Sequence, residues 1–147
     1  MKQFFVLIYS LIVGANSFAG NAKNINEKLI QSFKESFPDA QQVSWEELSE
    51  TYVVNFVEDG VRSNIIYLKD GTFLRSTRYY QERTLPYYLL VNIKKKYADK
   101  KIFGITEIST ITNIEYYIKL EDAKVLITIR VDGDGNLNMV EKYRKAS

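Results

Sequence analysis

The second half of the chain repeats the spacing of the first half. Residues 29–39 carry apolar side chains one helical turn apart, a lysine at the sixth position and a final aspartate, and residues 89–99 carry the same residue types at these positions. The two segments start about 60 positions apart, and Asp70-Gly71 later corresponds to Asp132-Gly133. Self-similarity at this period predicts two copies of one supersecondary unit, here a helix followed by strands and hairpin turns.

The period of the apolar residues predicts the elements of each unit. Apolar stripes with a helical period predict helices over residues 25–37 and 85–97. Alternating runs, several of them separated by Asp-Gly turns, predict strands over residues 42–46, 51–57, 62–68, 72–80, 101–107, 112–120, 124–131 and 137–143. We therefore expect an α+β fold in which two tandem α-β4 repeats, residues 20–80 and 81–147, form one domain. Its sheet would be curved and mostly antiparallel, with both helices packed on one face.

Residues 1–19 are predicted to be a secretory signal peptide. Lys2 supplies a positive charge, and the apolar run over residues 4–13 is too short to span a bilayer. Small residues occupy the −3 and −1 positions of a cleavage site between Ala19 and Gly20, and no cysteine is present to carry a lipid anchor. We expect a mature protein that is periplasmic or secreted and has no membrane span.

The composition argues against catalysis. The chain of 147 residues has no histidine and no cysteine. It therefore lacks an imidazole base, a thiolate nucleophile, a Ser-His-Asp triad and a conventional zinc site. The formal net charge of +2 is too small to steer polyanions. We expect no enzyme activity and no catalytic residues, no cofactor, no metal and no nucleic-acid partner.

One segment resembles the start of an EF-hand calcium loop. Oxygen-bearing side chains alternate from Asp132 to Asn138. However, Leu137 stands where that loop needs a glycine, and Tyr143 stands where it needs a bidentate glutamate. The composition favours a hairpin turn built from Asp, Gly and Asn, and a role in binding calcium stays open.

The period-two alternation of the strands predicts which side chains share a face of the sheet. Alternate apolar residues such as Val54, Ile118 and Ile129 are expected on the helix side. The intervening residues are polar, aromatic and basic, and no other predicted element would cover them. The candidate partner-binding residues on this far face are Asn55, Arg78, Tyr80, Tyr117, Lys119, Thr128 and Arg130. A bulge within residues 72–80 would move Arg78 and Tyr80 to the other face, because a one-residue slip reverses every side chain.

Short motifs are spread over nearly the whole mature chain: Phe33-x-x-x-Phe37-Pro38-x-Ala40-x-x-Val43-x-Trp45, Tyr52-x-Val54-x-Phe56, Asp70-Gly71, Leu85-Pro86 and Ile93-x-x-x-Tyr97. Together they resemble the PepSY-like family of small secreted bacterial proteins, which is also described as β-lactamase-inhibitor-like. The resemblance implies two α/β units in one curved antiparallel sheet backed by helices, and it supplies no catalytic residues. In the inhibitor that gives the fold its name, the concave sheet face grips the enzyme. The second half departs from the motif, with Ala98 in the place of Pro38 and Ile105 in the place of Trp45.

An uncovered sheet face of this kind has three possible uses. The first is a non-enzymatic module that recognises a protein partner in the cell envelope, with inhibition of a secreted hydrolase as its most specific form. The alternative is a protein that binds or senses a small ligand, such as a glycan, a peptide or a lipid. The third use is self-association, so the chain is expected to be a monomer or a weak homodimer. The sequence does not identify the partner.

Overall fold

The computed structural model describes residues 24–146, so the signal peptide predicted for residues 1–19 lies outside the described residues. The first half of the chain contains α1 (Glu27–Ser36), β1 (Gln41–Glu47), β2 (Thr51–Glu58), β3 (Val61–Leu68) and β4 (Phe73–Tyr80). A short 3₁₀ helix, η1 (Glu82–Thr84), leads to the second half. That half contains α2 (Tyr87–Lys96), β5 (Lys101–Ser109), β6 (Ile114–Glu121), β7 (Val125–Val131) and β8 (Leu137–Arg144).

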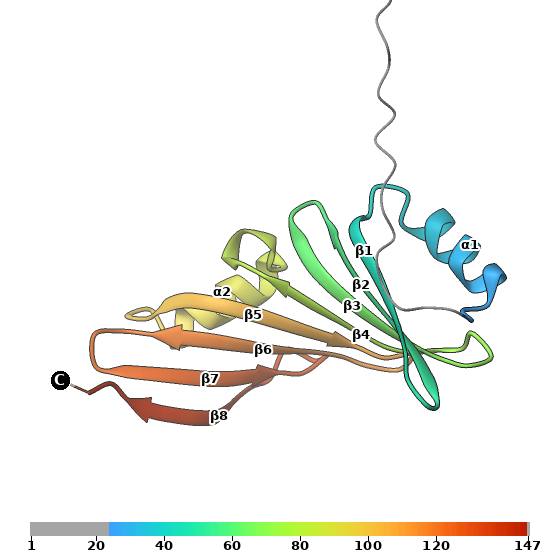
Figure 1. Ribbon diagram of the computed structural model, residues 1–147. Coiled ribbons are helices and arrows are strands. Elements are labelled where there is room, and N and C mark those ends of the chain that lie inside the picture. The colour runs from blue at the N-terminus through green and yellow to red at the C-terminus, as the bar shows by residue number, and fades with distance from the viewer. Residues whose placement is uncertain (1–23, 147) are drawn as a thin grey trace, which may run out of the picture.

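The strands form a single open sheet. Each strand pairs antiparallel with its neighbour in chain order, from β1 to β8. Tight turns can join consecutive strands because antiparallel neighbours need no crossover connection. Figure 1 shows that the sheet is strongly twisted, with α1 beside the first strands and α2 behind β4 and β5. The predicted α+β class, with one antiparallel sheet and two helices, is confirmed.

Each helix is stabilised by particular residues at its start and at its end. At the start of α1, the side chain of Asn26 accepts a hydrogen bond of 2.9 Å from the backbone N–H of Lys28, which satisfies one free donor of the first turn. At the start of α2, Pro86 occupies the cap position, where its missing N–H costs nothing. Both helices carry lysine in the last turn, where a positive charge suits the helix dipole.

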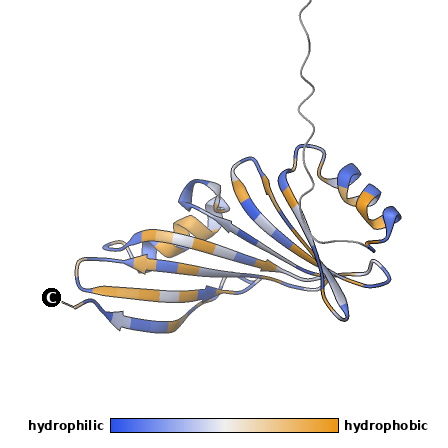
Figure 2. Ribbon diagram, in the orientation of Figure 1, coloured by the Kyte–Doolittle hydropathy of each residue, from blue (hydrophilic) through white to orange (hydrophobic). Residues whose placement is uncertain are grey.

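Each helix covers its own hydrophobic core. In the first core, the ring of Phe33 lies 5.4 Å from Trp45 and 5.1 Å from Phe56, both in edge-on geometry. In the second core, Leu89 of α2 is fully buried together with Ile118 of β6. Edge-on aromatic pairs add specific geometry to the burial of apolar area. Figure 2 shows the corresponding alternation of hydrophobic and hydrophilic residues along the strands.

Both cores lie on the same face of the sheet. A row of directly paired residues crosses β2 to β6 in the order Phe56, Ser63, Arg78, Glu107 and Tyr116. Phe56 belongs to the core under α1, and Tyr116 belongs to the core under α2. Because directly paired residues of neighbouring strands share a face, the two helices pack on one side, as predicted.

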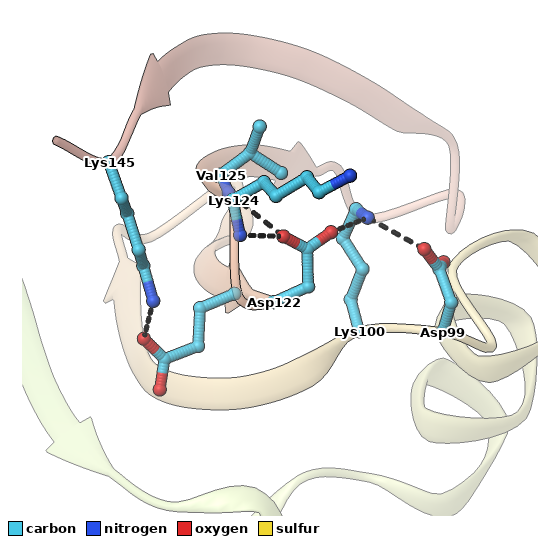
Figure 3. Close-up of polar contacts among 7 residues, drawn as sticks. Asp99, Lys100, Asp122, Lys124, Val125 and Lys145 are labelled. Atoms are coloured by element: carbon cyan, nitrogen blue, oxygen red, sulfur yellow. Dashed lines mark hydrogen bonds and ion pairs between the residues drawn. The ribbon is translucent and has the colours of Figure 1, made fainter. Parts of the chain in front are cut away.

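The turn between β6 and β7 is fixed by a network of polar contacts (Figure 3). One carboxylate oxygen of Asp122 accepts hydrogen bonds from the backbone N–H groups of Lys124 at 2.7 Å and Val125 at 2.8 Å. Its other oxygen accepts a hydrogen bond of 2.6 Å from Nζ of Lys100, which also donates to Asp99 at 2.8 Å. The network therefore ties the connection between α2 and β5 to the β6–β7 hairpin.

Candidate binding surface

The face of the sheet opposite α1 and α2 is called the open face, and no helix of residues 24–146 packs against it. A row of directly paired residues crosses it from β3 to β7 in the order Arg62, Tyr79, Thr106, Tyr117 and Arg130. The candidate residues that the structure places on the open face are Asn55, Tyr117, Lys119, Thr128 and Arg130.

The predicted far-face position of Arg78 and Tyr80 is wrong, because both lie on the helix side. Tyr80 pairs with Ile105, which is part of the core under α2. The cause is a bulge in β4: Phe73 pairs with Tyr67 and Arg75 pairs with Ile66, so Leu74 is an extra residue. One extra residue reverses the alternation of everything that follows it in the strand.

Arg78 and Tyr80 instead contact Glu107 on the helix side of the sheet, at the border of the core under α2. The hydroxyl of Tyr80 donates a hydrogen bond of 2.8 Å to one carboxylate oxygen of Glu107. The guanidinium of Arg78 lies 3.7 Å from the other oxygen and 5.7 Å from the centre of the Tyr80 ring. Burial raises the pKa of Tyr80, and the carboxylate of Glu107 raises it further. Sequence reasoning missed Glu107, although it follows Ile105 in the same phase of the strand.

On the open face, the remaining candidate residues form two separate groups. On β6 and β7, the hydroxyl of Tyr117 donates to Glu115 at 3.2 Å, and the guanidinium of Arg130 lies 3.9 Å from the same carboxylate. The Nε atom of Arg130 is buried and has no hydrogen-bond partner within residues 24–146. On β2, the side chain of Asn55 accepts a hydrogen bond of 2.9 Å from Asn64. The structure therefore does not bring Asn55 together with Tyr117 and Arg130.

A groove opens at the point where β4 ends. This β4-end groove has a volume of about 670 Å³, and its lining includes Arg62, Tyr79, Phe103 and Lys119. An adjoining hollow of about 370 Å³ shares Arg62 and Tyr79 with it and extends to Asn55. Of the residues named here, sequence reasoning identified only Asn55 and Lys119. The others were missed because the groove depends on where β4 stops pairing with β5. The alternation of apolar and polar residues within one strand does not reveal that point.

The segment that resembled a calcium loop is a hydrogen-bonded turn. One carboxylate oxygen of Asp132 accepts hydrogen bonds from the backbone N–H groups of Asp134 at 3.1 Å and Asn136 at 3.0 Å. The side-chain amide of Asn136 donates to both oxygens of Asp132, and these bonds lower the pKa of that carboxyl. No group of three or more acidic side chains within the described part of the chain is placed to hold a metal ion.

Two further findings concern membrane-spanning helices and matches to known families. No helix in residues 24–146 is both long enough and apolar enough to cross a membrane. No protein-family model matches the chain, and no curated protein matches it by sequence.

Solved structures resemble the fold. A BLIP-like protein from Bacteroides fragilis is 15% identical, with a TM-score of 0.61 over 82% of this chain and 86% of that chain. A DUF2874 family protein from Bacteroides ovatus is 16% identical, with a TM-score of 0.61 over 82% of this chain and 88% of that chain. A proposed periplasmic protein from Bacteroides eggerthii is 13% identical, with a TM-score of 0.60 over 82% and 89% of the two chains. These likenesses show a BLIP-like fold, while membership of the PepSY-like family stays a prediction.

Proposed function

We propose that the mature protein is a periplasmic or secreted, non-enzymatic module that binds a protein partner through the open face. The observation that carries this proposal is a broad sheet face with polar, aromatic and basic side chains that no element of residues 24–146 covers. Exposed tyrosine and arginine are the residue types that contribute most to protein recognition. The likeness to a BLIP-like protein and to a proposed periplasmic protein supports this reading of the fold.

The proposed contact residues follow from the register of the sheet. Tyr117 and Arg130 would supply the aromatic and cationic contacts, while Lys119 and Asn55 would extend the surface on either side. Thr128 is 9% exposed, so it contributes shape more than contact area. Arg78 and Tyr80 are not part of the proposed surface because both lie on the helix side of the sheet, where Tyr80 belongs to the core under α2.

Inhibition of a secreted hydrolase is the most specific form of the proposal, and it is supported by fold likeness alone. The absence of histidine and cysteine from the sequence supports a role in binding rather than catalysis. A small-ligand role is the alternative, and it predicts a thermal shift with a ligand instead of a complex with a protein.

The test is affinity capture from periplasmic and secreted fractions of the source organism, with protein starting at Gly20 as bait. The captured partner is then purified and its affinity measured by calorimetry. The open-face variant Tyr117→Ala/Arg130→Ala should weaken binding by about tenfold or more, because truncating one interface hot spot already costs that much.

The matched control is Tyr88→Ala/Lys95→Ala, which removes the same kinds of side chain from exposed positions of α2. This control should bind as well as the wild type. Equal binding by the open-face variant, or loss of binding by the α2 variant, would contradict the proposal. Melting curves of both variants establish that any loss is not due to unfolding.

A further inference from the structure

The β4-end groove lies beside an unpaired stretch of backbone. Residues 76–80 of β4 pair with residues 105–109 of β5, but β5 itself begins at Lys101. Residues 101–104 are therefore paired with β6 on one side only, and no strand of residues 24–146 lies on their other side. Four extended residues span about 13 Å. Gln81 and η1 face them across a hollow of about 390 Å³, and within the described range no backbone group of residues 81–84 bonds to residues 101–104. Strand backbone that is left unbonded in this way can pair with an incoming extended peptide.

The groove is surrounded by cations without ion-pair partners. The cations that line it and the adjoining hollow of about 390 Å³ beside η1 are Arg62, Arg83, Lys101 and Lys119. None of them forms an ion pair with any residue in the described range 24–146. Two acidic residues line the groove and the hollow beside η1. Glu82 forms an ion pair with Lys94 at 2.9 Å, whereas Asp59 forms no ion pair within the described range. The charge of the groove therefore favours a negatively charged occupant.

The groove also offers apolar contact and free space. The bulged residue Phe103 is 62% exposed, and Tyr79, which also lines the groove, is 46% exposed. A Cβ atom added at Gly104, which faces the groove, would meet no atom within 4 Å. The adjoining hollow of about 370 Å³, which shares Arg62 and Tyr79 with the groove, gives further space for the side chains of an occupant.

We propose that the β4-end groove binds an extended acidic segment of the partner protein, which adds a short strand to residues 101–104 of β5. The backbone of that segment would pair with β5, and its carboxylates would contact Arg62, Arg83 and Lys119. Exposed apolar side chains of the segment would rest on Phe103. This inference rests on the proposed function and specifies the chemistry of the partner.

The test is a titration of isotope-labelled mature protein with a synthetic peptide that alternates glutamate and valine and has blocked ends. Amide shifts in the NMR spectrum should concentrate on residues 101–104, Arg62 and Tyr79. A peptide with glutamine in place of each glutamate should bind at least tenfold more weakly. Affinity for the acidic peptide should fall several-fold at high salt, because exposed charges are screened.

Two variants probe the groove by independent means. The charge variant Arg62→Glu/Lys119→Glu should abolish the shifts, and its matched control Lys95→Glu/Lys142→Glu, with the same change in net charge on the helix side, should keep them. The steric variant Gly104→Leu fills the free space without altering charge. It should also lose the shifts while melting at the wild-type temperature, because the backbone there needs no positive φ.

Several results would overturn the inference. These are no shifts at millimolar peptide, shifts centred on the α2 lysines, equal binding of the glutamine peptide, or the same shifts with free glutamate alone. The proposed function stands apart from this test, because its variant at Tyr117 and Arg130 does not line the groove. A partner captured in an Arg130-dependent manner, together with a silent peptide titration, would retain the binding module and reject the acidic segment.

Discussion

At the scale of single residues, the adjacent pair Tyr79 and Tyr80 shows how one position decides a side chain's role. Tyr79 lies on the open face, where the guanidinium of Arg62 is 5.9 Å from the centre of its ring. Tyr80 is buried on the helix side and donates its hydroxyl hydrogen to Glu107. The same side chain is thus a surface group at one position and part of the core at the next.

The two tyrosines give a matched pair of substitutions. Tyr80→Phe should lower the free energy of unfolding by about 1–2 kcal/mol, because it leaves a carboxylate oxygen of Glu107 without its closest donor. The side chain of Glu107 is only 12% exposed, so water replaces that donor poorly. Tyr79→Phe should change stability by less than about 0.5 kcal/mol, as is usual for exposed positions.

Urea unfolding of the two variants measures this difference. Equal losses in both would mean that the hydrogen bond from Tyr80 to Glu107 does not stabilise the fold. A larger loss in Tyr79→Phe would contradict the register of β4, since it would place the buried tyrosine at position 79.

At the scale of elements, local sequence predicted what local forces determine. The stripe of Leu29 and Phe33 predicted α1, and the Asp59-Gly60 turn predicted the β2–β3 hairpin, because each depends on neighbouring residues only. The bulge at Leu74 depends on how β4 pairs with β3, and no pattern within β4 requires it. For the same reason, alternation placed Tyr117 and Lys119 on the open face but gave no sign of the β4-end groove.

The β6–β7 turn predicts a dependence of stability on pH. The hydrogen bond from Lys100 is the main reason that the pKa of Asp122 lies well below its ordinary value of 3.8, and the backbone N–H groups of Lys124 and Val125 lower it further. The unfolded chain therefore takes up a proton at Asp122 at a higher pH than the folded chain. The stabilisation from Asp122 is fully present above the ordinary carboxyl pKa and is lost as the pH falls toward the folded-state value.

Comparison of the wild type with Asp122→Asn isolates this contribution. The variant should be less stable than the wild type at neutral pH. The difference in free energy of unfolding should shrink as the pH falls from about 5 to 2, because Asp122 of the unfolded wild-type chain then becomes protonated. Urea midpoints at several pH values measure the difference. A difference that stays constant over this range would show that the turn is held by its shape and not by the charge of Asp122.

At the scale of the whole molecule, an open sheet has two edge strands, β1 and β8, that could pair with a second copy. Both edges carry features that discourage such pairing. The pairing of β1 with β2 is interrupted between Gln41 and Ser44, and Gln42 has a positive φ of 51°. The pairing of β8 with β7 is interrupted next to Val140, and Lys142 and other charged residues follow in the same strand. Bulges and lysines are common protections of edge strands.

These edges predict that the mature protein is a monomer in solution, although β8 also exposes Met139, Val140 and Tyr143. Light scattering coupled to size exclusion should give the mass of one chain over a wide range of concentration. If a dimer forms at high concentration, Val140→Lys should dissociate it when β8 is the contact, because a second charge would then lie beside Lys142. A dimer that resists Val140→Lys but dissociates on Tyr117→Ala would mean that a second copy occupies the open face, and the proposal of a different protein partner there would be wrong.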